Sequence, residues 1–157
     1  MNSQLETALR FVNLTASGLL AGSLGFGDAA LVPGWQEELP RHRSNMIEAL
    51  RHLNYYNAIG PLALGTAVTL AVGTRHNAAK RILDAAAAVA LAGVLAATVM
   101  VTVPINKELE EQPPTDYPSD RSQSLSKNWA RAHAVRTTLG ISAFVCAVAS
   151  GVAHRRC

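Results

Sequence analysis

The chain has 157 residues, of which 49% are hydrophobic, 16% are charged and 5% are aromatic, and its formal net charge is +3. This length corresponds to one domain, so we expect a single domain over residues 1–157. The small basic excess lies in short segments beside apolar blocks, which argues against nucleic acid as a partner. The two cysteines, Cys146 and Cys157, do not have the spacing of a metal site.

The apolar residues are gathered into four long blocks. Residues 11–27, 53–74, 85–106 and 137–153 contain no Asp, Glu, Lys or Arg. Each block has roughly the length that crosses a ~30 Å hydrocarbon core as a helix. The alternative is a soluble alanine-rich bundle, but such a bundle needs a polar stripe along each helix. Between residues 85 and 103 only Thr98 and Thr102 offer one.

We therefore predict an all-α integral membrane protein. Its architecture is an antiparallel four-helix bundle with an extracytoplasmic polar cap. The expected spans are about residues 7–31, 53–74, 80–104 and 132–153.

The first predicted helix has the features of a retained span and not of a signal peptide. Glu6 and Arg10 precede the apolar block, and no clean small-residue cleavage site follows it. Gly18 and Gly22 lie four residues apart, a spacing that lets a neighbouring backbone approach closely in lipid. We expect this glycine face to contact another helix.

A polar segment leads into the second predicted span and begins as a helix near Ser44. One side of this segment carries a stripe of polar side chains at heptad-like spacing: His42, Asn45, His52 and Tyr56. A tyrosine suits the membrane interface, where its ring is apolar and its hydroxyl is wet.

The third predicted helix, about residues 79–103, is closed by "VPINKEL". Pro104 lacks a backbone N–H, so we expect it to bend the last turn and direct Asn106 toward the outer mouth of the bundle. Residues 111–126 are rich in Pro, Ser and Asp, and we expect little regular structure there.

The fourth predicted helix opens with Trp129, His133, Arg136 and Gly140, spaced i, i+4, i+7 and i+11. This spacing places the four residues on one helical face. Ionisable groups at membrane depth are costly, so they tend to face the bundle interior and mark functional sites. Trp129 alone would suit an interfacial anchor, but Arg136 lies about a turn deeper than an anchor requires. The first three of these residues therefore form a row on one helical face.

Basic residues in short connections predict the orientation. The second connection carries Arg75, Lys80 and Arg81, and the chain ends in "HRRC", whereas the third connection is net acidic. We therefore expect a cell-membrane protein with both termini and the second connection in the cytoplasm. Three groups then converge on the outer mouth: Asn106, the row of Trp129, His133 and Arg136, and the polar stripe before the second span.

These residues resemble the anthrone oxygenase family of small four-helix membrane proteins, most of which have no assigned function. Members of that family carry a Pro-x-Asn motif at the end of the third helix and a Trp and an Arg at the start of the fourth. Pro104, Asn106, Trp129 and Arg136 occupy those positions, and His133 occupies a position that is often polar. The resemblance extends over nearly the whole chain in hydropathy and loop lengths.

The resemblance implies oxygenation of an activated C–H group next to a carbonyl. The substrate would be an enolisable, hydrophobic aromatic ketone of the anthrone type, with O₂ as co-substrate and no tightly bound cofactor. Such a reaction needs a base, and His133 or His52 is expected to remove the proton because imidazole titrates near working pH. The expected donors to the enolate oxygen are Asn106, Trp129 and Arg136. The side chains expected to contact the substrate are those of Tyr56, Asn45 and His42.

Two other functions fit the same residues. The first is a metal oxygenase in which His42, His52 and His133 bind iron or copper. Histidines ten residues apart on one helix are about 15 Å apart, so they share an ion only where the segment bends or breaks. The second is a non-enzymatic membrane protein with a packing, transport-accessory or stress role, whose polar mouth is structural.

Overall fold

The structure, a computed structural model, describes residues 2–33, 56–74, 77–111 and 120–153. All regular structure within these ranges is helical. Four long helices pack together, and they are α1 (Ser3–Phe26), α4 (Tyr56–Gly73), α5 (Ala78–Ala97) and α7 (Asp120–Val152).

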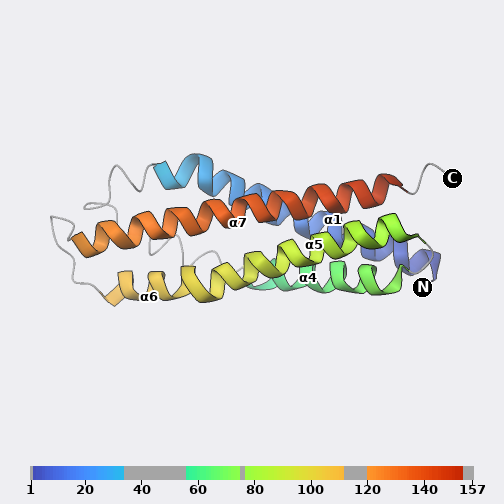
Figure 1. Ribbon diagram of the computed structural model, residues 1–157, viewed down its shortest axis with the longest axis horizontal. Coiled ribbons are helices and arrows are strands. Elements are labelled where there is room, and N and C mark those ends of the chain that lie inside the picture. The colour runs from blue at the N-terminus through green and yellow to red at the C-terminus, as the bar shows by residue number, and fades with distance from the viewer. Residues whose placement is uncertain (1, 34–55, 75–76, 112–119, 154–157) are drawn as a thin grey trace.

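Each long helix packs against two others, so the four form a closed ring around a common core. Helix α1 contacts α4 and α7, and α5 contacts the same two helices. Figure 1 shows that the helices run alternately in opposite directions, with α1 beginning and α7 ending at the same end of the bundle. The predicted antiparallel four-helix bundle is confirmed.

Two of the long helices continue as π-helical segments. Helix α1 passes into η1 (Gly27–Leu31), and α5 passes into η2 (Thr98–Thr102) and then into α6 (Val103–Glu111). The expectation that Pro104 closes the third helix is therefore wrong. Pro104 lies inside this continuous helical stretch, directly after η2, where the change from π-helical to α-helical hydrogen bonding accommodates its missing backbone N–H.

The start of α7 corrects a second expectation. The helix begins at Asp120, so residues 120–126 are helical and not irregular. An exposed ion pair links this first turn to α6, because Arg121 Nε donates to Glu108 Oε1 at 2.6 Å and Arg121 Nη2 donates to Glu108 Oε2 at 2.9 Å.

Three helical stretches are long and apolar enough to cross a membrane: Tyr56–Gly73, Ala78–Glu111 and Asp120–Val152. Helix α1 is not among them, because Arg10 and Asn13 make it more polar. Three of the four predicted spans are therefore confirmed as long apolar helices, and the span predicted for α1 is not. The outer faces carry large apolar side chains, such as Phe11, Val89 and Met100, each more than 70% exposed. Exposed apolar surface on this scale indicates an integral membrane protein.

The core is built mainly from small residues. Alanines at positions 16, 63, 67, 87 and 143 are buried, together with Leu20, Leu24 and Leu91. A second apolar cluster lies toward the α6 end and contains Val32, Ile105, Leu109, Leu125 and Trp129. Because alanines dominate the main core, the helix backbones can approach closely there.

The expected close backbone contact at the Gly18–Gly22 face of α1 is not present in the described part of the chain. A Cβ added at Gly18 would lie 3.1 Å from the ring of Phe144, so its neighbour is a side chain and not a backbone. Gly22 is exposed, and no described atom lies within 4 Å of where its Cβ would be. The buried face of α1 instead runs through Asn13, Ser17 and Leu24.

Candidate functional site

Trp129, His133 and Arg136 lie on one face of α7, and we call them the α7 row. The α7 row faces the interior of the bundle. The side chains of Trp129, His133 and Arg136 are 6%, 6% and 7% exposed, and Gly140 beneath them is also buried. The expected inward orientation is confirmed. The row lies near the end of the bundle formed by η1, η2 and α6, opposite the end where α1 begins (Figure 1).

The imidazole of His133 is held by α1. Its Nε2 lies 3.1 Å from the carbonyl oxygen of Leu24. A carbonyl oxygen only accepts, so Nε2 carries the hydrogen, and in a neutral ring the lone pair is on Nδ1. This Nδ1 is buried and has no hydrogen-bond partner among the described residues. The ring stacks on Trp129 with centroids 5.0 Å apart and planes 6° apart.

Gly27 makes this approach between α1 and α7 possible. A Cβ at position 27 would lie 2.7 Å from His133 Nε2, closer than a side-chain carbon can pack. The site therefore requires glycine here because the imidazole occupies the space that any side chain would need.

Arg136 is a buried cation with few partners. Its Nη1 donates to Thr102 Oγ1 at 3.4 Å, and its Nε has no acceptor among the described residues. Ion pairs in the described part of the chain involve Arg10, Lys80 and Arg121, and Arg136 is absent from them. A buried guanidinium left in this state is well placed to bind an anionic oxygen.

Other ionisable and polar groups surround the α7 row. Tyr56, at the start of α4, lies in the neighbourhood of Arg136, and Asp28 of η1 lies in that of His133. Asn106 of α6 lies four residues after Thr102, and its Oδ1 is buried without a partner in the described ranges. No hydrogen bond between Asn106 and Arg136 is present in these ranges.

Three of the expected site residues, His42, Asn45 and His52, lie outside the described residues, so their placement stays a prediction. Within the described ranges no group of three His, Cys, Asp or Glu side chains gathers as metal ligands. Sequence reasoning missed Thr102, Gly27 and the Leu24 carbonyl, none of which belongs to a residue type that marks a site by itself.

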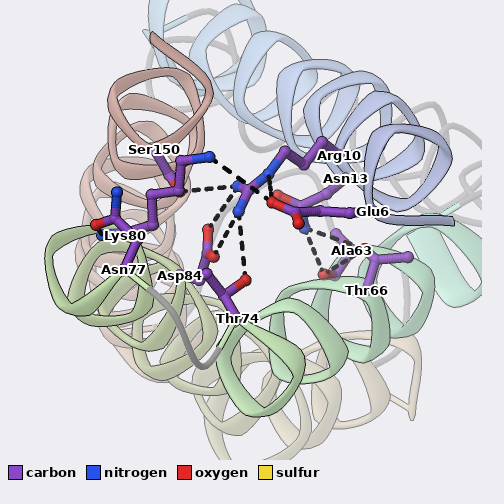
Figure 2. Close-up of polar contacts among 10 residues, drawn as sticks. All are labelled: Glu6, Arg10, Asn13, Ala63, Thr66, Thr74, Asn77, Lys80, Asp84 and Ser150. Carbon is purple, nitrogen blue, oxygen red and sulfur yellow. Dashed lines mark hydrogen bonds and ion pairs between the residues drawn. The ribbon is translucent and has the colours of Figure 1, made fainter. Parts of the chain in front are cut away.

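Sequence reasoning also missed a second buried polar cluster at the opposite end of the bundle. It centres on Arg10 of α1, and Figure 2 shows its side chains pointing toward one another between the helices. Arg10 Nη1 and Nη2 donate to Asp84 Oδ1 and Oδ2, each at 3.2 Å. Arg10 also donates to Glu6 Oε1 at 3.0 Å, to Ser150 Oγ at 2.8 Å and to Thr74 Oγ1 at 3.4 Å.

Lys80 completes this second cluster. Its Nζ lies 3.7 Å from Glu6 Oε1, and the side chain is buried. Lys80 is one of the basic residues from which the orientation was predicted, and its ammonium faces the bundle instead of the membrane surface. The available signal was charge spacing: Glu6 and Arg10, and likewise Lys80 and Asp84, are opposite charges four residues apart beside an apolar block.

Comparison with known proteins identifies the family to which this chain belongs. No curated protein and no solved structure matches the chain. A protein-family model described as anthrone oxygenase matches residues 52–146, which is more than half of the chain. The matched range contains the α7 row, Tyr56 and Asn106 but not α1. The chain therefore belongs to the anthrone oxygenase family, as its Pro-x-Asn motif and α7 row suggested.

Proposed function

We propose that this protein is a membrane-embedded oxygenase that converts an enolisable, hydrophobic aromatic ketone of the anthrone type to the corresponding quinone with O₂, and that it needs no tightly bound cofactor. Family membership supports an oxygenase-like role. The observation that carries the proposal is that two buried groups on one face of α7 both lack a hydrogen-bond partner in the described residues. They are His133 Nδ1 and Arg136 Nε.

His133 is the proposed base. Its Nε2 is engaged by the Leu24 carbonyl, which leaves Nδ1 as the lone-pair nitrogen. Trp129 covers one face of the ring and excludes water from it. A neutral imidazole of this kind can take a proton from a C–H group that is acidified by a neighbouring carbonyl.

Arg136 is the proposed partner of the enolate oxygen. The bundle holds a second guanidinium for comparison, that of the partly buried Arg10, which contacts the carboxylates of Glu6 and Asp84. A guanidinium with a purely structural role is expected to have carboxylate partners of this kind, because an unpaired buried charge is costly. Arg136 has a threonine hydroxyl as its described partner, so an enolate oxygen would supply the missing negative charge.

The chemistry balances without a further reactant. Nδ1 removes one proton from the CH₂ group, and the electron pair delocalises onto the ketone oxygen. The enolate then passes one electron to O₂, and the resulting carbon radical and superoxide combine to form a C–O bond. The imidazolium returns its proton to the peroxide anion. Loss of the second C–H proton breaks the O–O bond and gives the new carbonyl and water.

Supporting groups complete the proposed site. The Asn106 amide could donate to the same oxygen, and Tyr56 lies near enough to Arg136 to contact a substrate. We further propose that the protein lies in the cell membrane with both termini in the cytoplasm, so that the substrate enters from the lipid.

The test compares activity with stability in the same variants. Purified protein in lipid nanodiscs is given an anthrone, and O₂ uptake and quinone formation are followed. Arg136→Leu and His133→Gln should each lower turnover by roughly 10²-fold or more. Arg131→Leu is the matched control, because Arg131 is an exposed arginine on the same helix. Turnover by Arg136→Leu equal to that of the control would overturn the proposal. So would unfolding of Arg136→Leu as severe as that of the core variant Leu24→Ala, because Arg136 would then be a structural brace.

A further inference from the structure

The two π-helical segments flank the α7 row from two different helices. Segment η1 begins three residues after Leu24, whose carbonyl meets His133, and η2 ends at Thr102, whose hydroxyl meets Arg136. Segments of π-helix are rare in proteins and occur frequently at functional sites. Their coincidence with the row suggests that they aim backbone and side-chain groups at it.

The Leu24 carbonyl is shared among several donors. It receives His133 Nε2 at 3.1 Å and Thr137 Oγ1 at 3.3 Å, both from α7. The Gly27 N–H also points to it, shared with the carbonyl of Ser23, where α1 changes to η1. Thr137 lies one turn beyond His133 and is itself buried. Two side chains of α7 therefore form hydrogen bonds to the same backbone oxygen of α1.

We propose that Thr137 is a positioning residue for His133. Its hydroxyl and the Leu24 carbonyl together hold the imidazole with the hydrogen on Nε2, so that Nδ1 is presented as the base. Gly27 permits this arrangement by leaving room for the ring. This inference rests on the proposed function for its meaning in catalysis, but the protonated nitrogen can be observed without any substrate.

The physical argument concerns the acceptor. The Leu24 carbonyl oxygen is held by its own backbone and already accepts from the Gly27 N–H, so the threonine hydroxyl beside it restricts the directions from which the imidazole N–H can approach. Replacing Thr137 with the near-isosteric valine removes that donor and keeps the packing. The approach of the imidazole N–H is then less restricted, and the ring is freer to rotate or to move its hydrogen to Nδ1.

The first measurement is made on resting protein. Histidine ¹⁵N NMR spectra of the full chain distinguish a protonated from an unprotonated ring nitrogen, and the His133→Gln variant identifies the signals of His133. The unmodified protein should carry the hydrogen on Nε2. Thr137→Val should raise the share of the other form, and Thr137→Ser should restore the original spectrum because it restores the hydroxyl.

Thr138→Val is the matched control. Thr138 is the next residue, is exposed, and donates to the Ala134 carbonyl within its own helix. Thr137→Val should lower kcat for anthrone oxidation by about three- to tenfold, the equivalent of one hydrogen bond, with little change in KM. The pH profile of kcat should also shift, whereas Thr138→Val should change neither quantity.

A second pair of variants tests whether the His133 ring needs the space that Gly27 leaves by having no side chain. Gly27→Ala places a methyl group where His133 Nε2 now lies, so it should displace the ring and alter the NMR signals. Gly25→Ala is the control on the same helix, because no described atom lies within 4 Å of its Cβ position. If Gly27→Ala does not fold, the near-isosteric Thr137→Val still decides the question.

Two results would overturn the inference: a hydrogen on Nδ1 in the unmodified protein, or equal spectra and pH profiles for Thr137→Val and Thr138→Val. Failure of the proposed function looks different. In that case the spectra follow the expected pattern while no variant, nor the unmodified protein, oxidises an anthrone.

Discussion

Arg10 and Asp84 join two helices that are separated by a long stretch of chain, through a parallel two-point contact in which both carboxylate oxygens accept a hydrogen bond at 3.2 Å. The two residues belong to α1 and α5, which lie across the ring of helices from each other, since both pack on α4 and α7. Thr74, just after α4, and Ser150 of α7 each accept a hydrogen bond from the same Arg10 guanidinium. The contact therefore ties together all four helices at the end where α1 begins.

Breaking this tie should destabilise the bundle. Asp84→Asn leaves the partly buried Arg10 guanidinium with Glu6 as its carboxylate partner. Removing one partner of a buried pair typically costs about 3–5 kcal/mol, so we expect a loss at or below the lower end of this range. Denaturant unfolding in detergent measures the change, with Arg81→Gln as the control at an exposed basic residue nearby. The exchange variant Arg10→Asp with Asp84→Arg should recover part of the loss. Equal stability of Asp84→Asn and Arg81→Gln would show that the network contributes little.

Asn106→Ala should separate stability from activity. Asn106 Oδ1 has no partner in the described ranges, so removing it breaks no described hydrogen bond of that oxygen, and the melting temperature should stay within a few degrees of the original. Anthrone turnover should fall by roughly 10²-fold, as expected for the loss of an oxyanion donor. Lys107→Ala, at the exposed neighbouring residue, is the control. A lower melting temperature with unchanged turnover would assign Asn106 to packing.

The two glycines of α1 should respond very differently to substitution. A leucine at position 18 must displace the ring of Phe144, whereas a leucine at position 22 enters open space on the exposed face. Overpacking of this kind costs typically 1–3 kcal/mol, so Gly18→Leu should lower thermal stability and Gly22→Leu should not. The measurement is thermal unfolding of both variants in the same detergent. Destabilisation by Gly22→Leu would indicate that another molecule covers this face.

Orientation in the membrane can be tested by cysteine labelling from one side. With Cys146 and Cys157 replaced by serine, a cysteine at Ser124 should react with a membrane-impermeant maleimide added outside intact cells. A cysteine at Ala79 should react only after the membrane is permeabilised. Both positions are exposed in the bundle, so protein packing does not shield them. The reverse pattern would place both termini outside.

Much of the fold was predictable because hydrocarbon thickness constrains the sequence. A block without charges and about 20 residues long reports a helix whatever its neighbours are. The direction of the α7 row was predictable for a similar reason, since the spacing of Trp129, His133 and Arg136 fixes their common face. Burial of a cation at that depth is costly, which favoured the inward orientation that the structure shows.

The remaining features depend on tertiary contacts. Lys80 was interpreted from its place beside an apolar block, but the face it occupies, and hence its contact with Glu6, is set by how α5 packs. No amino-acid pattern marks a π-helical segment in a sequence. The direction of the Leu24 carbonyl toward His133 could therefore not be predicted. A proline lacks a backbone donor and so predicts a helix end, but here the preceding π-helical segment accommodates Pro104 and the helix continues to Glu111.

The length of α7 has a consequence for where the reactants of the proposed reaction would meet. His133 precedes the end of α7 at Val152 by about 20 residues, or roughly 30 Å of helix, which is the thickness of the hydrocarbon core. If the last 20 residues of α7 cross the hydrocarbon core, the imidazole would lie at the boundary between acyl chains and headgroups. A flat aromatic ketone can rest there with its rings in the acyl layer and its oxygen toward water. Dioxygen also dissolves better in acyl chains than in water, so the bilayer itself would act as the reservoir for both substrates.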